Sequence, residues 1–99
     1  MGGTTSVGTE GVVLGETPYE QTAEILRRVE HELSRAGALL SDVVQTRIYT
    51  VDISRADEIG RAHAEAFGEI RPVMTMVQVS SLIDPRMLVE IEAVAVVAR

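Results

Sequence analysis

The chain has 99 residues, 45% of them hydrophobic, and a net charge of −6, which predicts one packed domain over residues 1–99. Its nine basic residues are all arginine and form no basic stripe, so nucleic acid is not expected as a partner. The absence of cysteine excludes disulfides and thiol chemistry. With no leader-like start and no apolar run of bilayer length, we expect no membrane insertion and a cytoplasmic location.

The N-terminal part combines a predicted loop with the first helix. Residues 1–11 are rich in Gly, Thr and Ser and are predicted to be a loop, followed by a short strand at 12–14. Thr17, Pro18 and Glu20 are typical of a helix start, because the Thr and Glu side chains can cap reciprocally. Apolar residues then recur at helical spacing as far as Gly37, which is expected to end the helix.

The rest of the chain predicts a strand, a helix and two further strands. Residues 43–51 form a β-branched strand, and Ser54 with Asp57 three residues later is expected to open a second helix that stops at Gly68. Arg71 precedes a proline and is expected to be extended. Strands are then predicted at 73–80 and 87–97, separated by a turn at 83–86. The order β-α-β-α-β-β predicts two helices on one face of a sheet.

Both faces of this sheet carry apolar residues. Successive strand residues alternate in direction, so Met74 and Met76 share one side of their strand while valines and Thr75 share the other. In the last strand, one side combines apolar residues with the carboxylates Glu90 and Glu92. Helices on one face would leave the opposite face apolar and exposed, which predicts an oligomer that buries it.

Several segments resemble the Rid (YjgF-type) family, many members of which are imine or enamine deaminases. They are Leu33-Ser-Arg-Ala-Gly-Ala, Leu40-Ser-Asp-Val-Val-Gln-Thr-Arg-Ile-Tyr-Thr-Val-Asp, Ala64-Glu-Ala-Phe-Gly and Val89-Glu-Ile-Glu-Ala-Val-Ala-Val. The resemblance covers the chain from Thr17 to Val97 in the family's order. It implies an α+β, chorismate-mutase-like (Rid-type) mixed sheet with two helices on one face, and a homotrimer with small-metabolite clefts between subunits.

The resemblance also implies site residues. In deaminating members, the first Glu of the Glu-Ile-Glu motif positions the water that attacks the imine carbon, so Glu90 is the candidate catalytic residue. An arginine after a Pro-Ala pair holds the substrate carboxylate in those members, but Met74 stands at that position here. A thioether cannot replace the bidentate grip of a guanidinium. Arg71 is a weak substitute, because residues three apart on a strand point to opposite faces.

The neighbours of these positions are further candidates for substrate binding. Thr75 and Met76 flank the altered position, although strand packing explains Met76 equally well. Glu92 shares the side of Glu90 and is a binding or ion-pair candidate, with Arg47 and Arg86 as its expected partners. No cofactor is expected. No metal site is expected either, because the two histidines lack carboxylates at ligand spacing.

The N-terminus departs from the family pattern as well. Family members carry two strands leading into a Ser-Gly pair in the pocket wall, whereas here these strands look shortened. Gly2-Gly3-Thr4 aligns with that pair, which makes Gly3 a candidate substrate-binding residue. His63, between Ile59 and Phe67 on the inner side of its helix, is interpreted as a histidine at the boundary of the core rather than a catalytic one.

Three functional hypotheses remain. The leading one is a homotrimer that binds a small metabolite in inter-subunit clefts, with altered or absent imine hydrolase activity. The first alternative is an active deaminase that hydrolyses a reactive imine to a carbonyl compound and ammonia, and the second is a structural trimer that binds a partner protein. Glu90 itself also has a plainer reading, as a structural carboxylate hydrogen-bonded across a subunit boundary.

Overall fold

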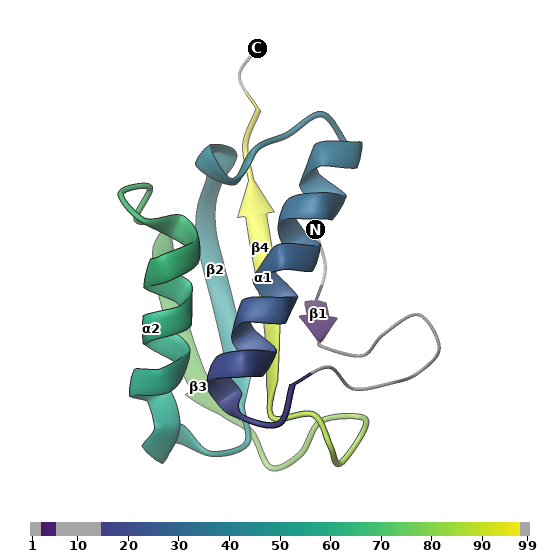
Figure 1. Cartoon of the computed structure of the whole chain (residues 1–99), viewed down its shortest axis with the longest axis vertical. Coiled ribbons are helices and arrows are strands. Elements are labelled where there is room, and N and C mark those ends of the chain that lie inside the picture. Colours follow the sequence, from purple (N-terminus) through teal and green to yellow (C-terminus); the bar gives the residue numbers. More distant parts are fainter. Residues whose placement is uncertain (1–2, 6–14, 98–99) are drawn as a thin grey trace.

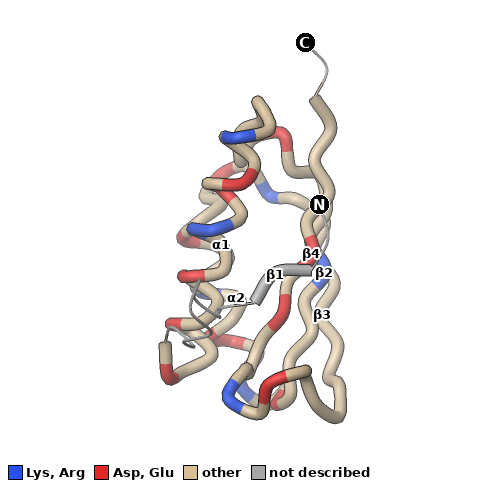
Figure 2. The backbone as a smooth tube through the Cα atoms, turned by 90° about the vertical axis from the view of Figure 1, so that its right-hand side faces the viewer, with Lys and Arg blue, Asp and Glu red and all other residues tan. Residues whose placement is uncertain are grey.

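The computed structural model describes residues 3–5 and 15–97. Two helices lie side by side across one face of a sheet (Figure 1), and no described element covers the opposite face (Figure 2). We call that uncovered side the open face. The elements are β1 (Gly3–Thr5), α1 (Pro18–Arg35), η1 (Leu40–Asp42), β2 (Val43–Thr50), η2 (Ile53–Arg55), α2 (Ala56–Phe67), β3 (Val73–Gln78) and β4 (Val89–Ala95).

The sheet is mixed, as expected, with the strand order β1-β4-β2-β3. β4 runs antiparallel to both of its neighbours, β1 and β2, whereas β2 and β3 are parallel and joined through α2. The buried residues of β2 and β4 all face the helices. This core contains Ile25, Leu26, Val29, Leu33, Ala38, Val43, Ile48, Ile59, Phe67, Val89, Ile91 and Ala93.

The start of the chain differs from the prediction. The expected loop at 1–11 contains β1, whose backbone pairs with β4 so that Gly3 lies opposite Glu92 and Thr5 opposite Glu90. Main-chain pairing with an open strand edge needs no β-branched side chain, so composition did not indicate it. The short strand expected at 12–14 lies outside the described residues. The two long C-terminal strands are shorter than expected, ending at Gln78 and Ala95.

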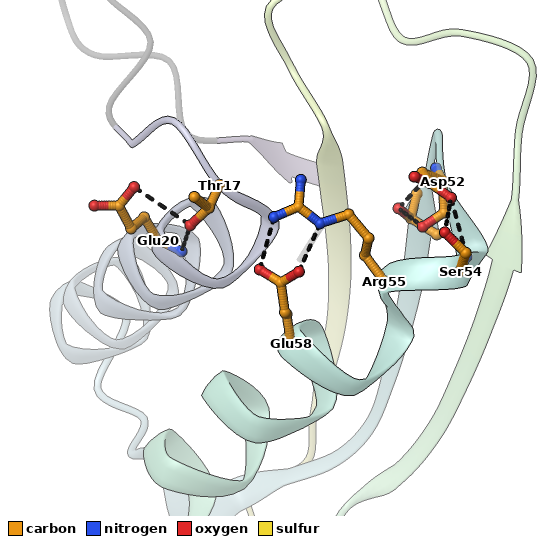
Figure 3. Close-up of polar contacts among 7 residues, drawn as sticks. Thr17, Glu20, Asp52, Ser54, Arg55 and Glu58 are labelled. Atoms are coloured by element: carbon orange, nitrogen blue, oxygen red, sulfur yellow. Dashed lines mark hydrogen bonds and ion pairs between the residues drawn. The ribbon is translucent and has the colours of Figure 1, made fainter.

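The cap of α1 is confirmed and is drawn in Figure 3. The Thr17 hydroxyl oxygen accepts a hydrogen bond from the Glu20 amide at 3.1 Å and donates to the Glu20 carboxylate at 3.3 Å. The same carboxylate accepts the Glu16 amide at 3.1 Å. At the other end Gly37 adopts φ 81°, as predicted for a helix stop.

The start of α2 was predicted wrongly. The side chain that caps this region is Asp52, which accepts hydrogen bonds from the Ser54 amide at 3.0 Å and the Ser54 hydroxyl at 2.6 Å (Figure 3). Residues 53–55 then form the short helix η2, and α2 begins at Ala56. Arg55 and Glu58 pair across this junction through contacts of 2.6 and 3.0 Å.

The segment between α2 and β3 also differs from the prediction. Arg71 was expected to be extended, but it adopts φ 51°, a region that few non-glycine residues occupy. The chain must reverse direction here, because β3 runs parallel to β2. A hydrogen bond from the Ile70 amide to the Phe67 carbonyl, 3.0 Å long, tightens that reversal. The turn therefore overrides the local preference of a residue before proline.

Gln21 fixes the point at which β4 begins. Its side chain is 1% exposed, and its amide nitrogen donates to the carbonyls of Gly15 at 3.2 Å and Arg86 at 3.0 Å. Its amide oxygen accepts from the Leu88 backbone at 2.8 Å. These bonds satisfy buried backbone groups and hold the residues just before β4 against the first turn of α1.

His63 lies on the inner side of α2, as predicted, but it is buried in the core rather than placed at its boundary. It is 7% exposed, its Nε2 lies 2.8 Å from the Thr46 hydroxyl oxygen, and its ring is 4.6 Å from that of Phe67. Burial disfavours the imidazolium and lowers the pKa of His63 below its ordinary value of 6.5. Within residues 15–97, no three His, Asp or Glu side chains gather as metal ligands.

We expect the free energy of unfolding to fall as pH drops below 6.5, because the unfolded chain then protonates His63 while the folded chain resists it. The free energy of unfolding continues to fall until the pH reaches the lowered pKa of His63 in the folded chain, by at most about 1.4 kcal/mol per pH unit. Urea unfolding at several pH values should show a smaller slope in His63→Gln than in the native protein. The exposed control His31→Gln should keep the native slope; equal slopes in all three proteins would contradict the prediction.

Candidate functional site

A row of polar side chains crosses the open face of the sheet. On β2 the row contains Gln45, Arg47 and Tyr49, which alternate with the buried residues of that strand. On β4 it contains Glu92 opposite Arg47 and Glu90 opposite Tyr49. Residues that pair side by side in a sheet point to the same face, so the five side chains share one surface. We call them the polar row.

Exposed valines surround the polar row. Val73 and Val77 on β3 are 67% and 41% exposed, and Val94 on β4 is 47% exposed. Val96, just beyond β4, is 58% exposed. An apolar surface of this kind around polar groups is typical of a contact surface or a ligand site.

Tyr49 and Glu92 form the central contact of the row. The Tyr49 hydroxyl donates a hydrogen bond to a carboxylate oxygen of Glu92. That bond, reinforced by the negative charge of the carboxylate, raises the pKa of Tyr49 above its ordinary value of 10.0, while Arg47 acts on it in the opposite direction. Tyr49 is therefore a stable donor at neutral pH. Beside it lies a depression of about 80 Å³ lined by Gln45, Arg47, Glu92 and Val94.

Glu90 differs from Glu92 in having no such partner. It is half-buried and lies between Tyr49 of β2 and Thr5 of β1 in the strand register. Among residues 15–97, none donates a hydrogen bond to its carboxylate or forms an ion pair with it. A half-buried carboxylate without a donor remains available to a water molecule or a ligand.

The structure divides the predicted site residues between two faces. Glu90 and Glu92 lie on the open face, and Thr75 is there too, beside Arg47 in the register of β2 with β3. Gly3 pairs with Glu92 through the backbone of β1. Met74 and Met76 lie on the helix-facing side, opposite Thr46 and Ile48, and Met76 packs against the core. Within one chain, Met74 therefore does not meet Glu90.

Arg86 was expected as a partner of Glu92 and instead holds Asp84. Two guanidinium contacts of 3.1 and 2.7 Å join them, and the pair holds the pKa of Asp84 at about 2. The tight turn of residues 84–86 favours this local partner over a strand residue. Tyr49 was not among the predicted site residues, although its two-residue spacing from Arg47 on a predicted strand places both side chains on one face.

Comparison with known proteins gives consistent matches. The sequence profile of the endoribonuclease L-PSP family matches residues 1–97. The chain is 36% identical over 78 residues to an uncharacterised protein of Streptomyces coelicolor, covering 79% of this chain and 58% of that protein. It is 40% identical over 75 residues to the 3-aminoacrylate deaminase RutC of Acinetobacter baylyi, covering 76% of this chain and 59% of that protein. The chain thus spans about three fifths of the length of these curated relatives.

Solved structures match over almost all of the chain. A member of the YjgF/YER057c/UK114 family from Mycobacterium tuberculosis is 54% identical with a TM-score of 0.87, and the match covers 96% of this chain and 75% of that one. A Rid-family protein of unknown function from Yersinia pestis is 29% identical with a TM-score of 0.88, covering 96% and 76%. These matches confirm the expected chorismate-mutase-like fold. Neither helix in the described part of the chain is apolar enough over its length to cross a bilayer.

Replacing Glu92 with Gln should lower the pKa of Tyr49 towards 10.0, because the accepting carboxylate is the main cause of its rise. The other tyrosine, Tyr19, must be replaced first, because a hydrogen bond to Glu65 raises the pKa of Tyr19 as well. In a Tyr19→Phe background, a spectrophotometric titration of phenolate absorbance then reports Tyr49 alone. Glu30→Gln, an exposed change on α1, is the control and should leave the titration in place. An unchanged titration in Glu92→Gln would contradict the assignment.

Proposed function

The chain belongs to the Rid (YjgF-type) family, also called the endoribonuclease L-PSP family, and we propose that it is a cytoplasmic homotrimer that binds a small metabolite between subunits. We further propose that it has an altered imine hydrolase activity that depends on Glu90. The observation that carries this proposal is a half-buried carboxylate, unpartnered by residues 15–97, on an uncovered sheet face where exposed valines surround a row of polar side chains.

The case for assembly rests on the open face. Val73, Val77 and Val94 leave between 41% and 67% of their surfaces exposed on a sheet that has no second covering layer among the described elements. Burying such side chains stabilises an assembly by roughly 25 cal/mol for each Å² of apolar surface removed from water. The number of three copies is taken from the family resemblance. A second copy against this face would also enclose the polar row.

The case for hydrolysis rests on the chemistry open to Glu90. As a carboxylate it can accept a proton from a water molecule while the water oxygen attacks the imine carbon. The proton then passes to the nitrogen. The hydroxyl of the resulting carbinolamine gives its proton to the carboxylate as the carbon–nitrogen bond breaks, and the products are a carbonyl compound and ammonia. Enclosure between subunits would exclude bulk water and strengthen the interaction of the carboxylate with a cationic imine nitrogen.

The activity is proposed as altered because of Met74. A methionine offers neither positive charge nor hydrogen-bond donor, so any ligand that meets position 74 meets an apolar group. The alternative, an unaltered deaminase, is favoured by the 40% identity to a relative named as 3-aminoacrylate deaminase. The two readings differ in which imines are hydrolysed and how fast, and not in the role given to Glu90.

We expect the protein to sediment as a trimer of 10.7 kDa chains. Val77→Glu places a charge in the proposed contact and should shift the protein towards monomer, because a buried unpaired carboxylate is costly. Leu39→Glu is the matched control, since Leu39 is 59% exposed at the N-cap of η1 and belongs to none of the strands of the sheet. If the native protein sediments as a folded monomer at micromolar concentration, the proposed trimer is wrong.

Glu90→Gln should lower imine hydrolysis by about 100-fold or more, because an amide cannot accept the proton of the attacking water. The assay measures ammonia release from imines that an amino-acid oxidase generates in the same vessel. Glu30→Gln changes the same chemical group on the exposed side of α1 and should keep native activity. Equal rates in the Glu90 variant and the native protein would remove Glu90 from the reaction.

A further inference from the structure

We infer that Gln21 is a positioning residue for Glu90. Its side chain on α1 holds the backbone that enters β4, two residues before Glu90, and so fixes where the carboxylate meets a ligand on the open face. The inference rests on the proposed function, because it gives Gln21 a part in the hydrolysis assigned to Glu90. Gln21 does not touch the ligand itself, since α1 covers the opposite face of the sheet (Figure 1).

The backbone of Leu88 is bonded partly by a strand and partly by a helix side chain. In an antiparallel pair, two facing residues of the hydrogen-bonded kind exchange two backbone bonds. Val51 and Leu88 continue the register of β2 with β4 by one step, and the Val51 amide donates to the Leu88 carbonyl at 3.2 Å. The Leu88 amide, however, donates to the side-chain oxygen of Gln21 at 2.8 Å. Gln21 therefore completes the ladder two residues before Glu90.

The nitrogen end of the Gln21 side chain holds two carbonyls at the same time. It donates to the carbonyl of Arg86 at 3.0 Å and to that of Gly15 at 3.2 Å. A primary amide combines two donor hydrogens with an acceptor oxygen, and here both ends bind backbone groups. Gln21 is only 1% exposed, so bulk water does not replace these bonds. A side chain that lacks either function would leave buried backbone groups unpaired, which is costly.

The two carbonyls that Gln21 binds are themselves held in place. In the turn before β4, the Asp84 carboxylate accepts the Arg86 amide at 2.9 Å and the Asp84 carbonyl accepts the Met87 amide at 2.9 Å. Gly15 adopts φ 99°, and a Cβ at this position would lie 3.0 Å from the backbone nitrogen of Gln21. Only a glycine brings its carbonyl so close to the first turn of α1. Gln21 thus connects fixed points on both sides of it.

The position of Leu88 carries over to Glu90 because the two are neighbours on one side of the strand backbone. Met87 and Val89 are 6% and 0% exposed and pack on the helix-facing side, so this stretch of chain has little freedom to turn. Without Gln21, the entry to β4 would depend on its backbone bond to β2. A misplacement of about 1 Å at a reacting group can lower a rate about 100-fold.

Thr22, the next residue of α1, provides a matched control. It is 0% exposed, and its hydroxyl has no hydrogen-bond partner among the described residues. Thr22→Val therefore alters a buried side chain in the same helical turn without removing a hydrogen bond of the described structure. Any effect of Gln21 variants that Thr22→Val lacks belongs to the hydrogen bonds of Gln21.

Amide hydrogen exchange, followed by NMR on the assembled protein, tests the anchor. In the native protein the Leu88 amide should exchange as slowly as that of Glu92, four residues further along β4. Gln21→Met removes both donor and acceptor and should speed exchange at Leu88 and Glu90 about 10-fold or more relative to Glu92. A general loss of stability would raise all three alike, and Thr22→Val should keep the native ratio. An unchanged ratio in Gln21→Met, or rapid exchange at Leu88 in the native protein, would overturn the inference.

Kinetics test whether the anchor serves the reaction. Gln21→Met should lower kcat for imine hydrolysis about 10- to 100-fold and leave KM within about twofold, because Gln21 does not touch the ligand. Thr22→Val should keep both constants. Gln21→Glu should lose less than Gln21→Met, since burial favours the protonated carboxyl, which can still accept the Leu88 amide and donate to one carbonyl. It also replaces Gln21→Met in both experiments if that variant does not fold.

The inference and the proposed function fail separately. If the native protein shows no Glu90-dependent hydrolysis, the proposed hydrolase is wrong, and the exchange ratio alone decides whether Gln21 holds the strand. If hydrolysis depends on Glu90 but Gln21→Met and Gln21→Glu keep the native kcat, Gln21 has no part in the reaction. A rise in KM without a fall in kcat would equally overturn the positioning role.

Discussion

The register of β4 between β1 and β2 is the constraint on which both the core and the candidate site depend. In this register Val89, Ile91 and Ala93 are buried against the helices, and Glu90 and Glu92 therefore point to the open face. A slip of one residue would exchange the two sets and bury both carboxylates. The core thus fixes the site indirectly, because burying three apolar side chains on one side leaves no other direction for the acidic ones.

Gln21 strengthens this constraint from outside the sheet. It binds the carbonyl of Arg86 and the amide of Leu88, so the backbone just ahead of the first paired residue of β4 is tied to α1. On the helix-facing side, Thr46 and His63 satisfy each other in a similar way. The charged residues of α1 and α2 are distributed along both helices (Figure 2), and all of them are exposed or half-buried. The open face is different, since its polar groups pair little and its valines remain exposed.

The elements that could be predicted from the sequence are those with local causes. Thr17 and Gly37 bound α1 because capping and positive φ depend on one residue each, and strand alternation placed Glu90 and Glu92 on one side correctly. The failures have non-local causes. β1 forms because β4 offers an edge, Arg71 adopts φ 51° because the chain reverses there, and Arg86 turns to Asp84 because the turn brings them together. The link between Tyr49 and Glu92 joins residues distant in the sequence and needed the strand register to be seen.

The two faces of the sheet also change the meaning of position 74. Met74 pairs with Thr46 on the helix-facing side, so within one chain the sheet itself separates its side chain from Glu90. Residue 74 and residue 90 can line one cleft only if they come from different copies, or if the cleft wraps around the edge strand β3. Arg47, by contrast, lies on the same face of the sheet as Glu90. Within one chain, the guanidinium of Arg47 on the open face therefore does not take the place of the side chain of residue 74 on the edge strand β3. They lie on opposite faces of the sheet, and the open face is the one that carries the charged residues Arg47, Glu90 and Glu92.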